Sequence, residues 1–151
     1  MTTAIAPTLG PSAQASAWQG TGPASLFLGA VTCAAIAIVL VSPNPWPVAV
    51  LLLFAPLAEE SAFRAGMQEW MLRRGIHQWT ASLATAVAFC ALHCSSRGIS
   101  LLSVAVILPG LFVGWVYARH RCLRLCVALH MLMNILWLGS SQLALPVART
   151  L

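Results

Sequence analysis

The chain has 151 residues, of which 60% are hydrophobic and only 7% are charged, and its net charge is +5. A water-soluble domain of this length could not bury so much apolar surface, so the composition excludes a soluble globular protein and indicates a membrane protein. All eight basic residues are arginines, and apart from Arg64 they lie outside the hydrophobic segments or at their ends, without a basic stripe of interleaved aromatics, which excludes a nucleic-acid partner.

The order of hydrophobic segments predicts an all-α fold, a polytopic transmembrane helix bundle of about five spans in contact with membrane lipid. Residues 1–24 are rich in Ala, Thr, Ser, Pro and Gly and hold no charged side chain, which predicts a flexible N-terminal tail. Residues 25–139 form the predicted transmembrane domain, and residues 140–151 a short C-terminal tail. The expected spans are residues 25–41, 46–74, 79–94, 99–118 and 122–138.

The distribution of arginines over the segment ends predicts the orientation of the bundle. Five arginines fall on one side and two on the other: Arg73, Arg74, Arg119, Arg121 and Arg124 against Arg97 and Arg149. The side with more arginines should be cytoplasmic, so a bundle of five spans has its N-terminus in the cytoplasm.

The second predicted span carries adjacent carboxylates, Glu59 and Glu60, in a chain whose third acidic residue is Glu69. Because an ionisable group at membrane depth is costly without a partner, such a pair indicates a functional site. Glu60 and Arg64 are four residues apart on one helix face, which predicts an ion pair, whereas Glu59 is turned about 100 degrees away and stays available as a general base for water. Glu69 and Arg73 have the same spacing and predict a solvated ion pair at the helix end.

Two later spans bring further polar groups to the depth of the glutamates. With a rise of 1.5 Å per residue, four side chains lie about 14–22 Å from the cytoplasmic helix ends: Glu59, His93, His130 and Asn134. His93 could share a water with Glu59, and His130 and Asn134 could donate hydrogen bonds to a developing oxyanion. These groups would suffice to hydrolyse an acyl bond without a covalent enzyme intermediate.

Three short motifs follow one another on the predicted spans. They are EExxxR in residues 59–64, FxxxH in residues 89–93 and HxxxN in residues 130–134. Each is weak alone, but their order and their placement on hydrophobic helices resemble the CAAX prenyl protease and bacteriocin-processing family of intramembrane glutamic endopeptidases.

This resemblance implies a role for each of six residues and implies no required metal or other cofactor. Water activation is implied for Glu59 and His93, shaping of the site for Glu60 and Arg64, and oxyanion stabilisation for His130 and Asn134. The chain has about five spans where larger members have about eight, and it looks more like compact prokaryotic members that accompany C-terminal sorting signals, such as the JDVT-CTERM type. We therefore expect an endopeptidase of a prokaryotic inner membrane that cleaves the C-terminal region of a membrane-associated protein.

Other interpretations of the same residues remain open. The buried polar groups could form a structural network between helices, or the chain could be a non-enzymatic immunity protein or a proton-linked transporter, although no internal repeat supports transport. A zinc-dependent membrane peptidase is a further alternative. Its candidate ligands are Cys90, His93 and Cys94 in one helical region and Cys122, Cys126 and His130 in another, with Glu59 or Glu60 completing a tetrahedral set. Buried cysteines in such helices are more often packing residues than ligands, and the same is expected of Cys33.

Overall fold

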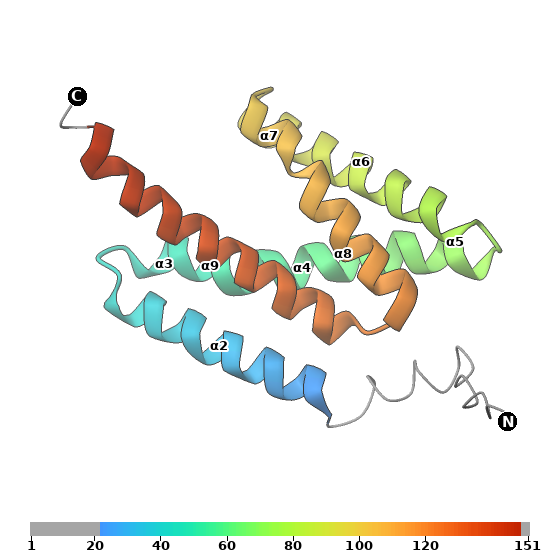
Figure 1. The fold of residues 1–151 in the computed structure, drawn as a ribbon, viewed down its shortest axis with the longest axis horizontal. Helices are drawn as coiled ribbons and strands as arrows, with labels where there is room; N and C mark the ends of the chain where they lie inside the picture. The colour runs from blue at the N-terminus through green and yellow to red at the C-terminus, as the bar shows by residue number, and fades with distance from the viewer. Residues whose placement is uncertain (1–21, 149–151) are drawn as a thin grey trace, which may run out of the picture.

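The computed structural model describes the backbone of residues 22–148 and the side chains of residues 22–140, and this part of the chain contains helices and no strands. Five long helical segments form the bundle in Figure 1. The elements are α2 (Pro23–Val41), α3 (Pro45–Ala49), η1 (Val50–Phe54), α4 (Ala55–Glu60), η2 (Ser61–Gln68), α5 (Glu69–Arg73), α6 (Gln78–Arg97), α7 (Leu101–Ala105), α8 (Ile107–His120) and α9 (Leu123–Ala148). The predicted all-α helix bundle is confirmed.

Four helical segments of the described residues are long and apolar enough to cross a membrane: Pro23–Val41, Pro45–Arg73, Leu101–His120 and Leu123–Ser140. The third predicted span, residues 79–94, corresponds to α6, which is 20 residues long but does not reach that hydropathy. Polar residues on both its exposed and its buried face lower the hydropathy, and the buried ones are Ser82, Thr85 and His93. A helix can carry such groups at membrane depth when they find partners inside the protein.

Two helix ends differ from the sequence prediction. The first helix begins at Pro23, inside the predicted N-terminal tail, while residues 1–21 of that tail lie outside the described part. The last helix continues to Ala148 instead of ending near Leu138. Gly139 does not end it, since a glycine in a helix interior costs only about 1 kcal/mol relative to alanine. Arg149 lies outside the described residues.

The helix α9 occupies a central position in the bundle. It contacts α2 on one side and the second helical segment and α8 on the other, while α6 packs against α8 (Figure 1). One apolar cluster joins α2, η1 and α9, and a second joins α8 and α9. Their buried members are Val31, Ala35, Leu52, Val127 and Met131 in the first cluster, and Val113, Val116, Tyr117 and Cys126 in the second.

The second helical segment is not a regular α-helix. The π-helical segments η1 and η2 flank α4, so that wider turns stand on both sides of Glu59 and Glu60. Ser61 Oγ, at the start of η2, donates a hydrogen bond of 2.6 Å to the carbonyl of Leu57. Such π-turns inside helices occur frequently at functional sites. The irregularity therefore marks the same short segment that the two carboxylates indicate.

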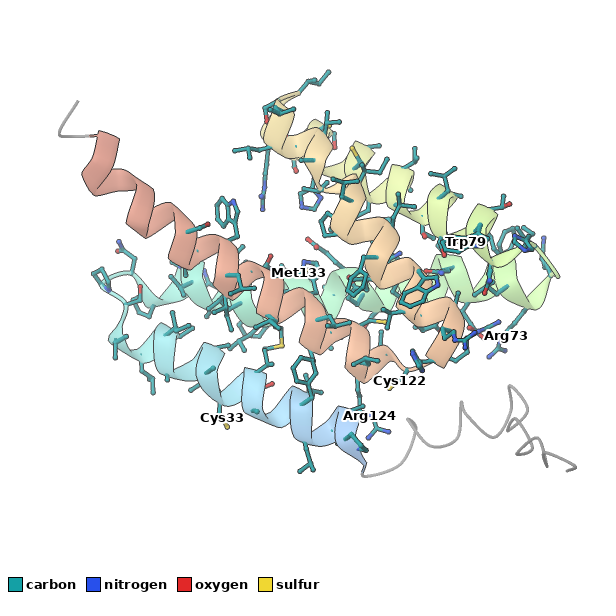
Figure 2. The ribbon with its side chains drawn as sticks, viewed as in Figure 1. Cys33, Arg73, Trp79, Cys122, Arg124 and Met133 are labelled. Atoms are coloured by element: carbon teal, nitrogen blue, oxygen red, sulfur yellow. The ribbon has the colours of Figure 1, made fainter. Side chains whose placement is uncertain are left out.

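The arginine-rich end of the bundle is held by Glu69. As expected, Glu69 pairs with Arg73 at 2.8 Å, but it also accepts hydrogen bonds from Tyr117 Oη at 3.0 Å and from Arg121 Nη1. The prediction of a merely solvated pair was wrong for Glu69, because its second oxygen links α5 to the end of α8. Arg124 donates to Ser25 at the same end, where Figure 2 shows both Arg73 and Arg124. The side of the membrane on which this end lies stays a prediction.

Candidate active site

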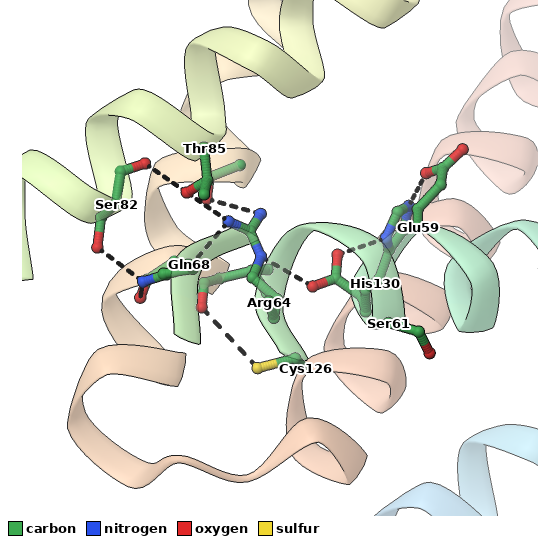
Figure 3. Close-up of polar contacts among 12 residues, drawn as sticks. Glu59, Ser61, Arg64, Gln68, Ser82, Thr85, Cys126 and His130 are labelled. Carbon is green, nitrogen blue, oxygen red and sulfur yellow. Dashed lines mark hydrogen bonds and ion pairs between the residues drawn. The ribbon is translucent and has the colours of Figure 1, made fainter. Parts of the chain in front are cut away.

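A buried polar network lies at the centre of the bundle, and Arg64 is its hub (Figure 3). The Arg64 side chain is 1% exposed, and its Nε donates to Glu60 Oε2 at 2.9 Å, which confirms the predicted ion pair. Its Nη1 donates to Thr85 Oγ1 at 3.1 Å and to Gln68 Oε1 at 3.3 Å, and its Nη2 donates to the Gly110 carbonyl at 3.1 Å. The guanidinium thus joins the second helical segment to both α6 and α8, with its charge balanced by a carboxylate.

Gln68 forms a second layer of this network. Its Nε2 donates to Ser82 Oγ at 3.1 Å and to the Gly114 carbonyl at 2.7 Å. A methyl group at Gly114 would lie 3.2 Å from both Arg64 Nη1 and Ser82 Cβ, and one at Gly110 would lie 3.4 Å from a methyl of α6. The two glycines therefore allow α8 to pack closely against α6 and against the polar network.

His130 of α9 connects the two glutamates. Its Nδ1 lies 2.8 Å from Glu60 Oε1, and its Nε2 lies 3.6 Å from Glu59 Oε2. A carboxylate can only accept, so Nδ1 carries a proton and donates to Glu60. The sequence placed His130 beside Asn134 as an oxyanion donor and predicted neither contact with a glutamate. In the structure, Glu60 accepts from Arg64 with one oxygen and from His130 with the other.

His93 and Asn134 each use one polar group to fix the side chain. His93 Nδ1 lies 3.1 Å from the Phe89 carbonyl, which must accept, so the proton is on Nδ1 and Nε2 is left as the second ring nitrogen. Asn134 Nδ2 donates to the Leu51 carbonyl at 2.9 Å and retains a second N–H. The Phe89 ring centroid lies 4.4 Å from that of His93 and 5.9 Å from that of His130, so an aromatic ring adjoins both imidazoles.

All six residues singled out in the sequence line one cavity with a volume of about 630 Å³: Glu59, Glu60, Arg64, His93, His130 and Asn134. The expected convergence of the three motifs in space is therefore confirmed. Within this cavity the two glutamates differ in exposure, since the Glu59 side chain is 23% exposed and that of Glu60 only 2%. Glu59 is the carboxylate that a molecule in the cavity can reach.

The cavity extends from the buried network to the end of α6 and the beginning of α7. Exposed residues line it there, among them Arg97, Ser100 and Leu102, together with Trp137 of α9. Aliphatic residues of α8 and Phe89 form much of the remaining wall. The shape is that of a largely apolar pocket with a few convergent polar groups, as in many ligand-binding sites.

The cysteines do not assemble the ligand sets that the zinc alternative requires. Cys126 Sγ lies 3.9 Å from the Val113 carbonyl, and Cys90 Sγ lies 3.6 Å from the Ser103 carbonyl. Cys33 is exposed on α2 and points away from the bundle in Figure 2, so its interpretation as a buried residue was wrong. Within residues 22–148, no group of three or more His, Cys, Asp or Glu side chains is placed to hold a metal ion.

A family model of type II CAAX prenyl endopeptidases, described as Rce1-like, matches residues 40–136, well over half of the chain. The chain belongs to this family. Membership in the Rce1-like family identifies a protease, and together with the four span-capable helices it identifies an integral membrane protein. The matched region begins at the end of α2 and includes all six residues named above. No curated protein and no solved structure matches the chain.

The sequence reasoning missed three residues of the buried network: Gln68, Ser82 and Thr85. A signal for Gln68 was present, since Glu60, Arg64 and Gln68 follow one another at intervals of four and form a polar stripe on one helix face. Ser82 and Thr85 gave a weaker signal, because small hydroxyl residues are common at helix contacts in membrane proteins.

Proposed function

We propose that this Rce1-like chain is an intramembrane glutamic-type endopeptidase, which hydrolyses a peptide bond in the C-terminal region of a membrane-associated protein. The observation that carries the proposal is the different engagement of the two carboxylates. Glu60 is bonded through both oxygens, to Arg64 and His130, whereas Glu59 is partly exposed in the cavity and has His130 Nε2 at 3.6 Å. One carboxylate is thus structural, and the other is available for chemistry.

In the proposed reaction, Glu59 and His93 hold the attacking water. The Glu59 carboxylate and the unprotonated Nε2 of His93 are both acceptors, so each can take one hydrogen bond from the same water. Glu59 removes a proton from the water as the water oxygen attacks the scissile carbonyl carbon. The C–O bond forms while the carbonyl π electrons move to the oxygen, which gives a tetrahedral oxyanion.

The oxyanion is assigned to Asn134 and His130. The second N–H of Asn134 is unused by the Leu51 carbonyl, and His130 can donate from Nε2 when that nitrogen is protonated. With His130 protonated, the charges of Glu59, Glu60, Arg64 and His130 sum to zero. A cluster of zero net charge avoids the cost of an uncompensated charge inside the bundle.

Collapse of the intermediate completes the reaction. The carbonyl re-forms as the C–N bond breaks, and Glu59 passes the proton it took from the water to the leaving nitrogen. One water is consumed, and the products are an amine and a carboxylic acid, which releases its proton to solvent, with no bond to the enzyme. Glu60 and Arg64 act as positioning residues that hold His130 and the helices around it.

The test compares wild type with Glu59→Gln and with Glu69→Gln as a matched control. Glu69 lies at the other end of the second helical segment and does not line the cavity. Membranes from cells producing each variant are analysed for proteins shortened at the C-terminus, with ¹⁸O-water to label the new carboxylate. Loss of a general base should lower turnover by about 10²-fold or more, while Glu69→Gln retains it. Labelled products at the wild-type rate from Glu59→Gln would refute the proposal.

A further inference from the structure

Arg97 lines the same cavity but belongs to none of the three motifs. It is the last residue of α6, four residues after His93, so both side chains lie on one face of the helix. Arg97 is exposed, and among the described residues no hydrogen bond or ion pair joins it to another group. The other arginine of the cavity, Arg64, donates hydrogen bonds to four partners in the buried network. Arg97 therefore offers a free guanidinium fork at the cavity's exposed end.

Two serines stand beside Arg97 in the cavity wall. Ser100 Oγ lies 2.9 Å from Ser103 Oγ and also accepts from the backbone N–H of Ser103. One hydroxyl proton is used between the two oxygens, and the other has no acceptor among the described residues. A guanidinium and a free hydroxyl proton together form a set of donors suited to the two oxygens of a carboxylate.

The charged groups around Glu59 are already engaged with one another. Arg64 pairs with Glu60, and His130 lies between the two glutamates, so among the described residues that line the cavity Arg97 is the cation left to attract a carboxylate. A peptide that carries its charge at one end would then be oriented, with its C-terminus at Arg97 and an internal carbonyl nearer Glu59 and His93. The cavity thus contains a means of distinguishing the two directions of a bound chain.

We propose that Arg97, assisted by Ser100 and Ser103, binds the C-terminal carboxylate of the substrate and so determines where the chain is held. This inference rests on the proposed endopeptidase function and adds the group that the enzyme recognises. A plain alternative is that Arg97 only balances the C-terminal dipole of α6 or contacts a lipid phosphate. If Arg97 only balanced the helix dipole or contacted a lipid phosphate, its replacement would have the same effect on peptides with either end group. If Arg97 binds the C-terminal carboxylate, its replacement should affect only the peptide that carries this carboxylate.

The experiment uses a labelled apolar peptide of Ala, Val and Leu in two forms, with a C-terminal carboxylate or a carboxamide. The full chain is reconstituted in phosphatidylcholine vesicles, and affinity and turnover are measured for wild type, Arg97→Lys, Arg97→Gln and Arg119→Gln. Arg119 is the matched control, since it is an exposed arginine near the end of α8 that does not line the cavity. Unchanged thermal unfolding confirms that each variant folds.

Wild type should bind the carboxylate form about tenfold more tightly than the carboxamide, the equivalent of about 1.4 kcal/mol. Arg97→Gln should remove this preference by weakening the carboxylate form alone, raising its KM about tenfold while kcat stays near the wild-type value. Arg97→Lys should retain part of the preference because it keeps the charge but loses the fork. Arg119→Gln should behave as wild type.

Equal binding of the two peptide forms by wild type, or equal weakening of both by Arg97→Gln, would overturn the inference. An effect of Arg97→Gln that changes when phosphatidylglycerol is added and ignores the peptide end group would assign the residue to lipid instead. Glu59→Gln separates this failure from failure of the proposed function. If it is inactive while the end group has no effect, only the Arg97 inference falls, whereas undiminished cleavage by Glu59→Gln refutes the endopeptidase mechanism itself.

Discussion

Replacement of Gln68 by methionine tests whether the buried network supports the site. Methionine keeps the length of the side chain and its helix preference, so the change removes polar contacts with little change in volume. The substitution removes three hydrogen bonds. Gln68 donates two of them, to Ser82 Oγ and to the Gly114 carbonyl, and accepts the third from Arg64 Nη1. Arg64 Nη1 keeps a partner in Thr85, so its charge is not left unsatisfied.

The expected cost follows from the kinds of bond removed. An interhelical hydrogen bond between neutral groups in a membrane protein contributes about 0.6 kcal/mol on average, and a bond to a charged group about 1.5–3 kcal/mol. Gln68→Met should therefore lower the free energy of unfolding by about 3–4 kcal/mol. Because Arg64 holds Glu60, and Glu60 holds His130, turnover should fall as well, although Glu59 and His93 are untouched.

The assay is reversible unfolding in mixed micelles, followed by helix content, with turnover of the same preparations. Gln78→Met is the matched control, because Gln78 is exposed at the start of α6 and makes no contact with the network. An exposed substitution of this kind should change stability by less than about 0.5 kcal/mol. If Gln68→Met and Gln78→Met proved equally stable and equally active, the supporting role of the network would be refuted.

Two further predictions concern close packing and metal dependence. Gly114→Ala should cost about 1–3 kcal/mol in the same unfolding assay, since the added methyl would lie 3.2 Å from two neighbouring side-chain atoms. Gly139→Ala, with nothing within 4 Å of the added methyl, should leave stability unchanged or raise it by up to about 1 kcal/mol, and a reversed ranking would contradict this account. Cys126→Ser should retain hydrolysis, and treatment with a chelator should leave turnover intact; stoichiometric zinc whose removal abolishes activity would reverse the assignment.

The parts of the site that the sequence could predict are those set by local helix geometry. The spacing of Glu60 and Arg64 predicted their ion pair, and the pair forms at 2.9 Å. The common depth of the motif residues predicted that they meet, and His93, His130 and Asn134 do line one cavity with the glutamates. Both predictions use only the fixed rise and turn per residue of a helix. A helix is the expected conformation of such long apolar segments, because in a membrane their backbone polar groups must be hydrogen-bonded within the protein.

What could not be predicted depends on how the helices rotate against one another. His130 lies close in depth to both glutamates, but depth does not say which nitrogen meets which carboxylate, and the contact with Glu60 emerged only from the packing of α9. The π-helical segments on either side of α4 have wider turns than an α-helix, and the sequence pattern did not predict them. Gly110 shows the same limit, since its carbonyl accepts from Arg64 across 46 residues of sequence.

The arrangement gives a physical reason for two adjacent carboxylates where one would perform the chemistry. A general base is useful only if the groups around the water are held in place, and at membrane depth bulk solvent does not stabilise a misplaced charge. Glu60 supplies that restraint by accepting from Arg64 and His130 at once, which fixes α9 against the second helical segment. A neutral residue at position 60 would leave Arg64 without its buried counter-ion, a cost of about 3–5 kcal/mol for a broken buried pair. Conservative replacement of Glu60 should therefore damage folding and turnover together, whereas replacement of Glu59 should damage turnover alone. This contrast tests the proposal that Glu60 positions the site and that Glu59 reacts.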